Sequence, residues 1–106
     1  MSAQERQIEY IKCVDCKAKE YDRQGYDVKA NVSEWSKPPT IDGLVPDIRA
    51  KRGNKIIIGR MLREEDLKNS EKELKKFINY AEKDENTSFR VYFTSADGKP
   101  RLHKIF

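Results

Sequence analysis

The sequence predicts an α/β fold of one domain, with a central mixed four-stranded sheet flanked by helices. Two stretches with helical spacing of apolar residues, and four short apolar runs bounded by turn residues, support this prediction. The predicted order is helix, three strands, helix, strand (α-β-β-β-α-β). The first three strands have short connections and favour antiparallel pairing, whereas a strand reached through a helix favours parallel pairing. A chain of 106 residues has the length of one domain, so residues 1–106 are assigned to it.

The N-terminal part predicts a helix, a strand and a long loop. Residues 3–24 form a helix whose apolar stripe comprises Ile8, Ile11, Val14, Ala18 and Tyr21. Gly25 ends this helix, as a glycine after a last helical turn commonly does. Residues 26–32 alternate apolar and polar side chains and predict a strand with one buried face. Residues 33–43 contain two prolines and predict a loop, in which Trp35 is either a lid over the core or a contact residue.

The middle of the chain predicts a β-hairpin. Residues 44–51 and 55–62 are the second and third strands, and residues 52–54 are the turn between them. Three consecutive isoleucines, residues 56–58, show no alternation, which indicates a strand that is covered on both faces.

The C-terminal part predicts a helix, a strand and a short final segment. Ser70 and Glu73 have the spacing of a capping box at the start of the second helix. This helix is expected to bury Leu74, Phe77, Ile78 and Ala81. Residues 88–94 are the fourth strand, and residues 96–100 form a turn. Residues 102–106 are a short terminal strand or an extended tail.

Composition and charge describe a highly charged chain with a basic middle. Charged residues make up 38% of the chain, the mean hydropathy is −0.91 and the net charge is +4. Residues 49–76 contain ten Lys or Arg against five Asp or Glu, whereas residues 1–48 contain seven against nine. A basic segment suits a nucleic-acid partner, although a solvated face of mixed charge is an equal alternative. The chain has no apolar run of about 18 residues, so no membrane span is expected.

The cysteines and the histidine carry little functional signal. Cys13 and Cys16 form a C-x-x-C within the first helix, and both are predicted to lie away from its apolar stripe. No second pair or matching histidine accompanies them, so two ordinary thiols are favoured over a bridged dimer, a shared metal or a redox pair. His103 has no nucleophile pattern around it. Two cysteines alone favour a cytoplasmic, reducing compartment.

Two short motifs add a family resemblance to this pattern. Gly25-Tyr26-Asp27-Val28 follows the first helix, and Pro46-Asp47 opens the second strand. In this order of elements, the chain resembles the PD-(D/E)xK nuclease superfamily, the restriction-endonuclease-like fold that includes archaeal Holliday junction resolvases. The resemblance covers residues 5–94. It implies a Mg²⁺-dependent phosphodiesterase, in which carboxylates on neighbouring strands hold the metal and a lysine helps to activate water. Resolvase-like members often dimerise, so a homodimer fits but decides nothing.

The resemblance also implies where the catalytic positions lie, and two of them depart from the motif. Asp47 matches the first aspartate of the family, whereas Arg60 stands at the second acid and Leu62 at the lysine. One carboxylate beside a guanidinium is a poor magnesium site. We therefore expect that Asp47 and Arg60 form an ion pair where the family holds its metal. The alternatives are that Arg60 points to solvent or contacts a phosphate.

Three functions follow from this reading. The favoured one is a nuclease-fold protein without catalysis that binds DNA or another nucleic acid, with Arg49, Lys51, Arg52, Lys55, Arg60 and Arg63 as candidate contacts. The second is an active Mg²⁺-dependent endonuclease that uses Asp47 with a relocated acid, Glu64 or Glu65, and with Lys51 or Lys55 replacing the lysine. Glu5 and Glu9 are further candidate acids for that alternative. The third is a small scaffold or protein-interaction domain with no nucleic-acid role.

Overall fold

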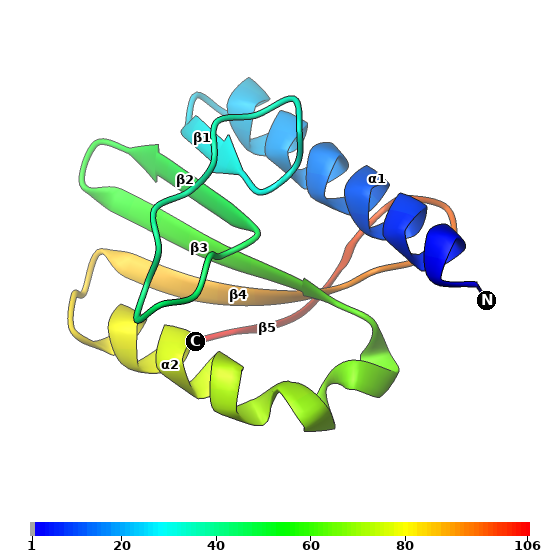
Figure 1. Cartoon of the computed structure of the whole chain (residues 1–106). Coiled ribbons are helices and arrows are strands. Elements are labelled where there is room, and N and C mark those ends of the chain that lie inside the picture. The colour runs from blue at the N-terminus through cyan, green and yellow to red at the C-terminus, as the bar shows by residue number, and fades with distance from the viewer. Residues whose placement is uncertain (1) are drawn as a thin grey trace.

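The computed structural model describes residues 2–106, which form one sheet and the helices packed on it (Figure 1). The elements in chain order are α1 (Ala3–Arg23), β1 (Asp27–Ala30), β2 (Ile48–Arg52), β3 (Lys55–Leu62), η1 (Glu64–Asp66), η2 (Lys68–Ser70), α2 (Glu71–Glu82), β4 (Thr87–Phe93) and β5 (Arg101–Ile105). The two η elements are short 3₁₀ turns that lead into α2.

The sheet is mixed, as predicted, and has the strand order β1-β2-β3-β4-β5. Only β3 and β4 are parallel, and the chain passes through α2 between them. The predicted count of four strands in the sheet is wrong, because residues 101–105 pair with β4 as a fifth strand, whereas the alternative in which the C-terminal residues form a short strand is confirmed. This pairing extends to the end of the chain, where Phe89 and Phe106 exchange backbone hydrogen bonds of 3.2 and 2.7 Å.

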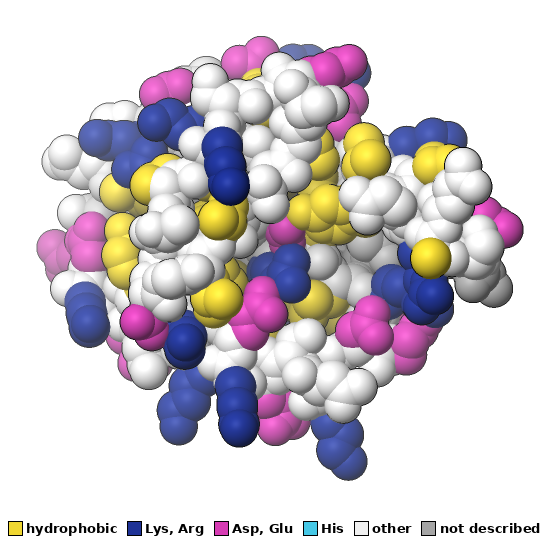
Figure 2. Space-filling model, in the orientation of Figure 1, with side chains coloured by type: hydrophobic (Ala, Val, Ile, Leu, Met, Phe, Trp, Pro, Cys, Tyr) yellow, Lys and Arg dark blue, Asp and Glu magenta, His cyan; other side chains and the backbone are white. Residues whose placement is uncertain are grey.

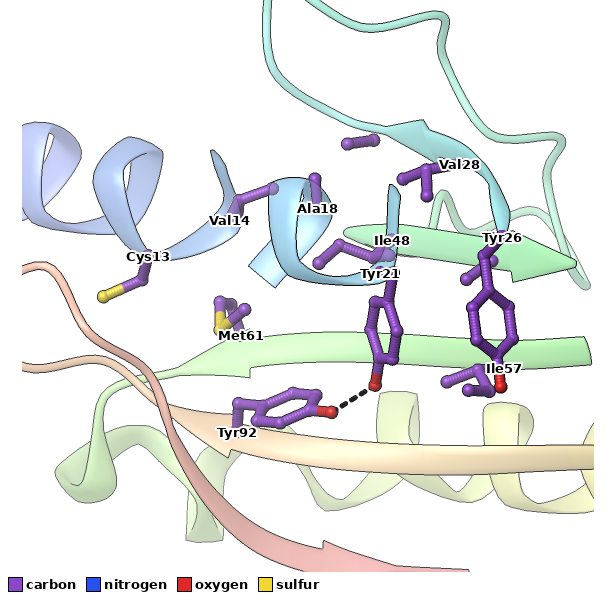
Figure 3. Close-up of a cluster of buried hydrophobic side chains, with 12 residues drawn as sticks. Cys13, Val14, Ala18, Tyr21, Tyr26, Val28, Ile48, Ile57, Met61 and Tyr92 are labelled. Atoms are coloured by element: carbon purple, nitrogen blue, oxygen red, sulfur yellow. Dashed lines mark hydrogen bonds between the residues drawn. The ribbon is translucent and has the colours of Figure 1, made fainter. Parts of the chain in front are cut away.

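Helices cover both faces of the sheet, with α1 on one side and α2 on the other (Figure 1). β3 is buried between them, as its isoleucine run predicts. Ile57 and Met61 belong to the cluster under α1, and Ile58 belongs to the cluster under α2. Figure 3 shows the α1 side, where Tyr21 and Tyr92 join their hydroxyls by a hydrogen bond. β3 therefore supplies both halves of the core.

The helix α1 begins and ends close to the predicted bounds, and Val14, Ala18 and Tyr21 of its predicted stripe are buried, but the first two residues of the stripe are not. Ile8 and Ile11 are 47% and 41% exposed, whereas Cys13 is fully buried. The prediction that Cys13 lies away from the core is therefore wrong. In the first half of α1 the inward face includes Tyr10 and Cys13 instead of Ile8 and Ile11, and the Tyr10 hydroxyl donates to the buried Asp47 just before β2. No described helix is long and apolar enough to cross a bilayer.

The hairpin of β2 and β3 follows the prediction at β3 and differs at β2. The predicted bounds of β3 are confirmed, and Arg52 pairs with Lys55 across a two-residue turn. Gly53 adopts φ +60° at the first turn position, which glycine permits without steric cost. β2 begins four residues later than predicted because residues 41 and 44 pair with each other instead. Pro46, which has no N–H to donate, follows that bridge.

Two local predictions around α2 and the long loop have different outcomes. α2 buries Leu74, Phe77 and Ala81 as predicted, with Ile78 partly buried. The capping box is wrong: the Ser70 hydroxyl donates to the carbonyl of Asp66 at 2.9 Å and makes no cap hydrogen bond. The preceding 3₁₀ turns lead directly into the helix, and Glu73 forms an ion pair with Arg60 instead.

Trp35 packs on the core, and its Nε1 donates to Asp15 at 3.0 Å, so it serves as a lid.

Candidate functional site

Asp47 lies one residue before β2, fixed by its backbone between two neighbours. Its N–H donates to the carbonyl of Gly59 at 3.0 Å, and its own carbonyl accepts from the N–H of Asn31 at 2.9 Å. These bonds continue the sheet pairing past the end of β2, so the side chain is held at the end of the sheet. Asp47 is 1% exposed, which would be costly for a carboxylate without partners.

Three donors satisfy the Asp47 carboxylate. Oδ2 accepts from Arg60 Nη1 at 2.7 Å and from the backbone N–H of Met61 at 2.6 Å. Oδ1 accepts from the hydroxyl of Tyr10 on α1. The predicted ion pair between Asp47 and Arg60 is confirmed, and the alternative in which Arg60 simply points to solvent is wrong. Both carboxylate oxygens are therefore engaged by groups of the chain itself.

Arg60 has a second acidic partner on α2. Its Nε lies 2.7 Å from Oε1 of Glu73, close enough for an ion pair, although the N–H direction does not meet hydrogen-bond geometry. Burial opposes the charge of Arg60, but the adjacent Asp47 and Glu73 outweigh it and raise the pKa of its guanidinium. Arg60 thus links the start of β2 to α2, at the place where the resemblance implies a metal.

Tyr10 is the group by which α1 contacts this centre. Burial first, and then the charge of Asp47, raise the pKa of its phenol well above the ordinary value. The neutral phenol is therefore the form that the folded state holds. The sequence analysis did not identify Tyr10 as a site residue. The available signal was its spacing of four residues from Arg6, which places both side chains on the same face of α1.

The tyrosine environment makes a titration prediction. The chain has five tyrosines, and the pKa values of Tyr10 and Tyr21 are raised, in both cases mainly by burial. We expect that these two do not ionise near pH 10, so that absorbance at 295 nm shows a late phase coincident with alkaline unfolding. The unfolded chain releases these protons first, so stability falls as pH rises above about 10. Tyr10→Phe should remove part of the late phase. An unchanged titration would contradict this assignment.

Leu62, the residue at which the nuclease resemblance implies a lysine, lies in the core. It is 6% exposed and packs in the cluster that contains Phe77 and Phe89. An apolar side chain here is therefore explained by packing against α2, and it contributes neither charge nor a proton to the centre.

The relocated acids do not join Asp47. Glu64 and Glu65 are exposed, and both pair with arginines: Glu64 lies 3.7 Å from Arg101, and Glu65 forms an ion pair with Arg63. Across residues 2–106, no three Asp, Glu, His or Cys side chains come together as a potential metal group. The structure thus does not bring Glu64 to Asp47 as the endonuclease alternative requires.

The predicted basic set divides between two ends of the sheet. Arg60 and Arg63 lie at the end of β3 and just beyond it, whereas Lys51, Arg52 and Lys55 lie at the hairpin. Lys55 and Arg60 are separated by about 17 Å along the strand at the usual rise. Arg52 has a structural role, because it donates to the carbonyl of Gln24 at 2.7 Å and covers the ring of Tyr26.

The sixth candidate of this set, Arg49, lies between the two ends of the sheet. It is partly buried opposite Ile58 in the middle of β2, so it belongs to neither group.

A pocket of about 480 Å³ opens beside Arg60. Its walls come from the N-terminal half of α1, the end of β3 and the 3₁₀ turns, and Figure 2 shows Lys and Arg side chains interspersed with Asp and Glu on this face of the molecule. The charged residues of the lining are Arg6, Arg60, Arg63 and Asp66, and Tyr10 and Thr94 also belong to it. Charge counting along the sequence missed Arg6 because it belongs to the acidic N-terminal segment, and only the packing of α1 brings it here. This basic pocket is the candidate binding site.

The cysteines and His103 lie outside the basic pocket. Cys13 and Cys16 are free thiols, and the Sγ of Cys13 contacts the carbonyl of Ser95 at 3.7 Å. Burial raises the pKa of the Cys13 thiol, which disfavours the reactive thiolate. His103 is exposed and stacks on Phe93 with ring centroids 4.4 Å apart. Packing accounts for Cys13 and His103.

Comparisons with known proteins add no relative to this picture. No model of a protein family matches the chain, and neither the curated proteins nor the solved structures contain a significant match.

Proposed function

We propose that this protein binds nucleic acid without cleaving it, through the basic pocket beside Arg60. The observation that carries the proposal is the contact between Arg60 and Asp47, 2.7 Å long, at the position where the nuclease resemblance implies a metal. A guanidinium fixed there takes the place that the resemblance gives to the metal ion, and its N–H groups that are not engaged by acids can donate to a phosphate.

The loss of catalysis is supported by the state of each motif position. Both oxygens of Asp47 accept from donors of the chain, so a metal would have to displace Tyr10 or Arg60 to reach them. Leu62 is part of the core and offers no charge for a developing phosphorane. The acids that the endonuclease alternative requires are paired with arginines at the surface instead.

Nucleic-acid binding is supported by the cations that remain available in the pocket. Asp47 and Glu73 largely neutralise Arg60, so the surplus charge comes from Arg6 and Arg63. Arg6 is exposed and has no carboxylate within 4.0 Å among the described residues. The Arg63–Glu65 pair lies on the surface, where such pairs contribute little and can exchange for a phosphate. The arrangement suits a phosphate group better than a neutral ligand.

Arg6→Gln is expected to weaken the binding of single-stranded or branched DNA about tenfold and to lower the salt dependence of log K by about one ion. The matched control is Arg23→Gln, because it removes the same charge from an exposed position at the other end of the same helix. Fluorescence anisotropy at two salt concentrations measures both effects. Equal losses in the two variants would indicate non-specific charge attraction and would contradict the pocket.

The same samples test catalysis directly. With Mn²⁺ or Mg²⁺, we expect binding without cleavage of branched, linear or single-stranded DNA. Metal-dependent cleavage that disappears in Asp47→Asn would overturn the non-catalytic assignment. The absence of binding to both DNA and RNA would overturn the proposal and would favour a protein-interaction scaffold.

A further inference from the structure

We infer that the basic pocket recognises a terminal phosphate of a nucleic-acid strand, in preference to a phosphate within a continuous backbone. This inference rests on the proposed nucleic-acid binding and specifies which part of the ligand enters the pocket. Two observations support this inference. The first is the set of hydrogen-bond donors in the basic pocket, and the second is an adjoining hollow lined by Glu9, Glu64 and Glu65, which we call the acidic hollow.

The donors in the pocket match the oxygens of a phosphate monoester. Arg6, Arg60 and Arg63 line it, and each guanidinium carries five N–H donors, so those of Arg60 exceed the ones its two acids engage. The hydroxyl oxygen of Thr94, also in the lining, is buried and has no hydrogen-bond partner among the described residues. A terminal phosphate has three free oxygens and a charge between about −1.5 and −2 near pH 7, against −1 for an internal phosphodiester.

Most carboxylates around the pocket are engaged with its arginines, and Glu65 is paired with Arg63. Asp66 is the only acid in the lining, and the carboxylates of Asp47 and Glu73 are engaged with Arg60. The cations left for a ligand are Arg6 and, once a phosphate replaces Glu65 beside it, Arg63. A dianion can engage both guanidinium groups, whereas a monoanion balances the charge of only one. The extra charge of a terminal phosphate would raise its affinity over an internal one.

The acidic hollow adjoins the basic pocket and shares Arg63 and Thr94 with it. It has a volume of about 260 Å³ and is lined by Glu9, Glu64, Glu65, Ser95, Ala96 and Arg101 as well as the two shared residues. Three glutamates face two arginines there, so its field opposes a polyanion. A strand that ran from the basic pocket into the acidic hollow would place its next phosphate among these carboxylates. The distance between that phosphate and the carboxylates would be shorter than the Debye length of about 8–10 Å, so salt would not screen their repulsion fully. The strand is expected to enter from the opposite side and to end in the pocket.

The first experiment compares ends on one sequence of single-stranded DNA. Fluorescence anisotropy is measured for a 12-nucleotide strand with a 5′-phosphate, with a 3′-phosphate, with no terminal phosphate, and for a circle of the same composition doubled in length. One phosphorylated end is expected to bind about tenfold tighter than the unphosphorylated strand, and the circle to bind most weakly. The arm that gains affinity identifies the end that is recognised. The same set in RNA tests the sugar.

The second experiment tests the acidic hollow as the cause of this preference. Glu64→Gln/Glu65→Gln is expected to improve binding of the circle at least threefold and to narrow the gap between circle and phosphorylated strand. The matched control, Glu82→Gln/Glu85→Gln, removes two exposed glutamates from the region around the C-terminal end of α2 and should leave that gap unchanged. Both double variants remove two negative charges. A general increase in net positive charge would therefore affect both variants equally and would not explain a change in only one.

The outcomes separate the inference from the proposed function. Equal affinity for phosphorylated and unphosphorylated strands, or a circle that binds as tightly as the linear strand, would overturn end recognition while nucleic-acid binding still stands. An unchanged preference in Glu64→Gln/Glu65→Gln would overturn the role of the acidic hollow. No binding in any arm would instead overturn the proposed function.

Discussion

Asp47→Ala is expected to lower the free energy of unfolding by about 3 kcal/mol, a factor of more than 100 in the unfolding equilibrium. The substitution removes the acceptor of three donors on two elements: the Tyr10 hydroxyl on α1, and the Arg60 guanidinium and the Met61 amide on β3. The Met61 N–H is then buried without a partner, and Arg60 keeps only Glu73. Urea denaturation followed by circular dichroism measures the loss.

Two further variants identify the cause of that loss. Glu73→Gln removes the second acid of Arg60, which is 32% exposed, and should cost less than about 1 kcal/mol. Asp47→Leu/Arg60→Met replaces the whole pair by apolar side chains of similar size and should recover much of the stability, because the one carboxylate that loses its partner, Glu73, is 32% exposed to water. Equal stability of Asp47→Ala and Glu73→Gln would contradict the role of the Asp47 carboxylate in joining α1 to β3.

Arg60→Glu is expected to be the most destabilising single change at this centre, with a loss of about 4 kcal/mol without divalent metal. It replaces the cation between Asp47 and Glu73 by a third carboxylate, so attraction becomes repulsion in a place that is largely shielded from water. Thermal unfolding in EDTA measures the effect. Arg60→Met is the control, since it removes the cation without adding a negative charge and should lie between Arg60→Glu and the parent protein.

Metal addition turns the same variant into a test of the nuclease resemblance. Three carboxylates close together form the hard oxygen ligands that Mg²⁺ and Mn²⁺ favour. We expect Mn²⁺ to raise the melting temperature of Arg60→Glu by several degrees and to leave the parent protein unchanged. Equal shifts in both proteins, or no shift in either, would contradict a latent metal position at the end of β3.

Adding Leu62→Lys to Arg60→Glu is expected not to produce cleavage, because Leu62 lies in the core. Leu62→Lys would place an ammonium group among Phe77 and Phe89, where no acid faces it within the cluster. Its desolvation costs several kcal/mol, so the doubly repaired protein should be too unstable to regain cleavage.

The sequence by itself determined the elements and much of the core. Helical spacing predicted α1 and α2, the isoleucine run predicted a strand buried on both faces, and the helix between β3 and β4 predicted their parallel pairing. These features depend on local propensity and on side-chain periodicity, which each segment carries on its own. The Asp47–Arg60 pair was also predictable, because neighbouring strands bring those two positions to one end of the sheet.

Only the tertiary structure decided how these elements meet. The packing of α1 on the sheet buries Cys13, exposes Ile8 and brings Tyr10 to Asp47, because contacts with residues far along the chain decide which face of a helix is buried. The sequence left residues 102–106 as either a strand or a tail, and only their pairing with the edge of β4 makes this segment a fifth strand. The basic pocket and the adjoining acidic hollow join side chains from distant segments, so their charges cannot be counted from local sequence. Fold class follows from local pattern, whereas the site depends on packing between segments that are far apart in the chain.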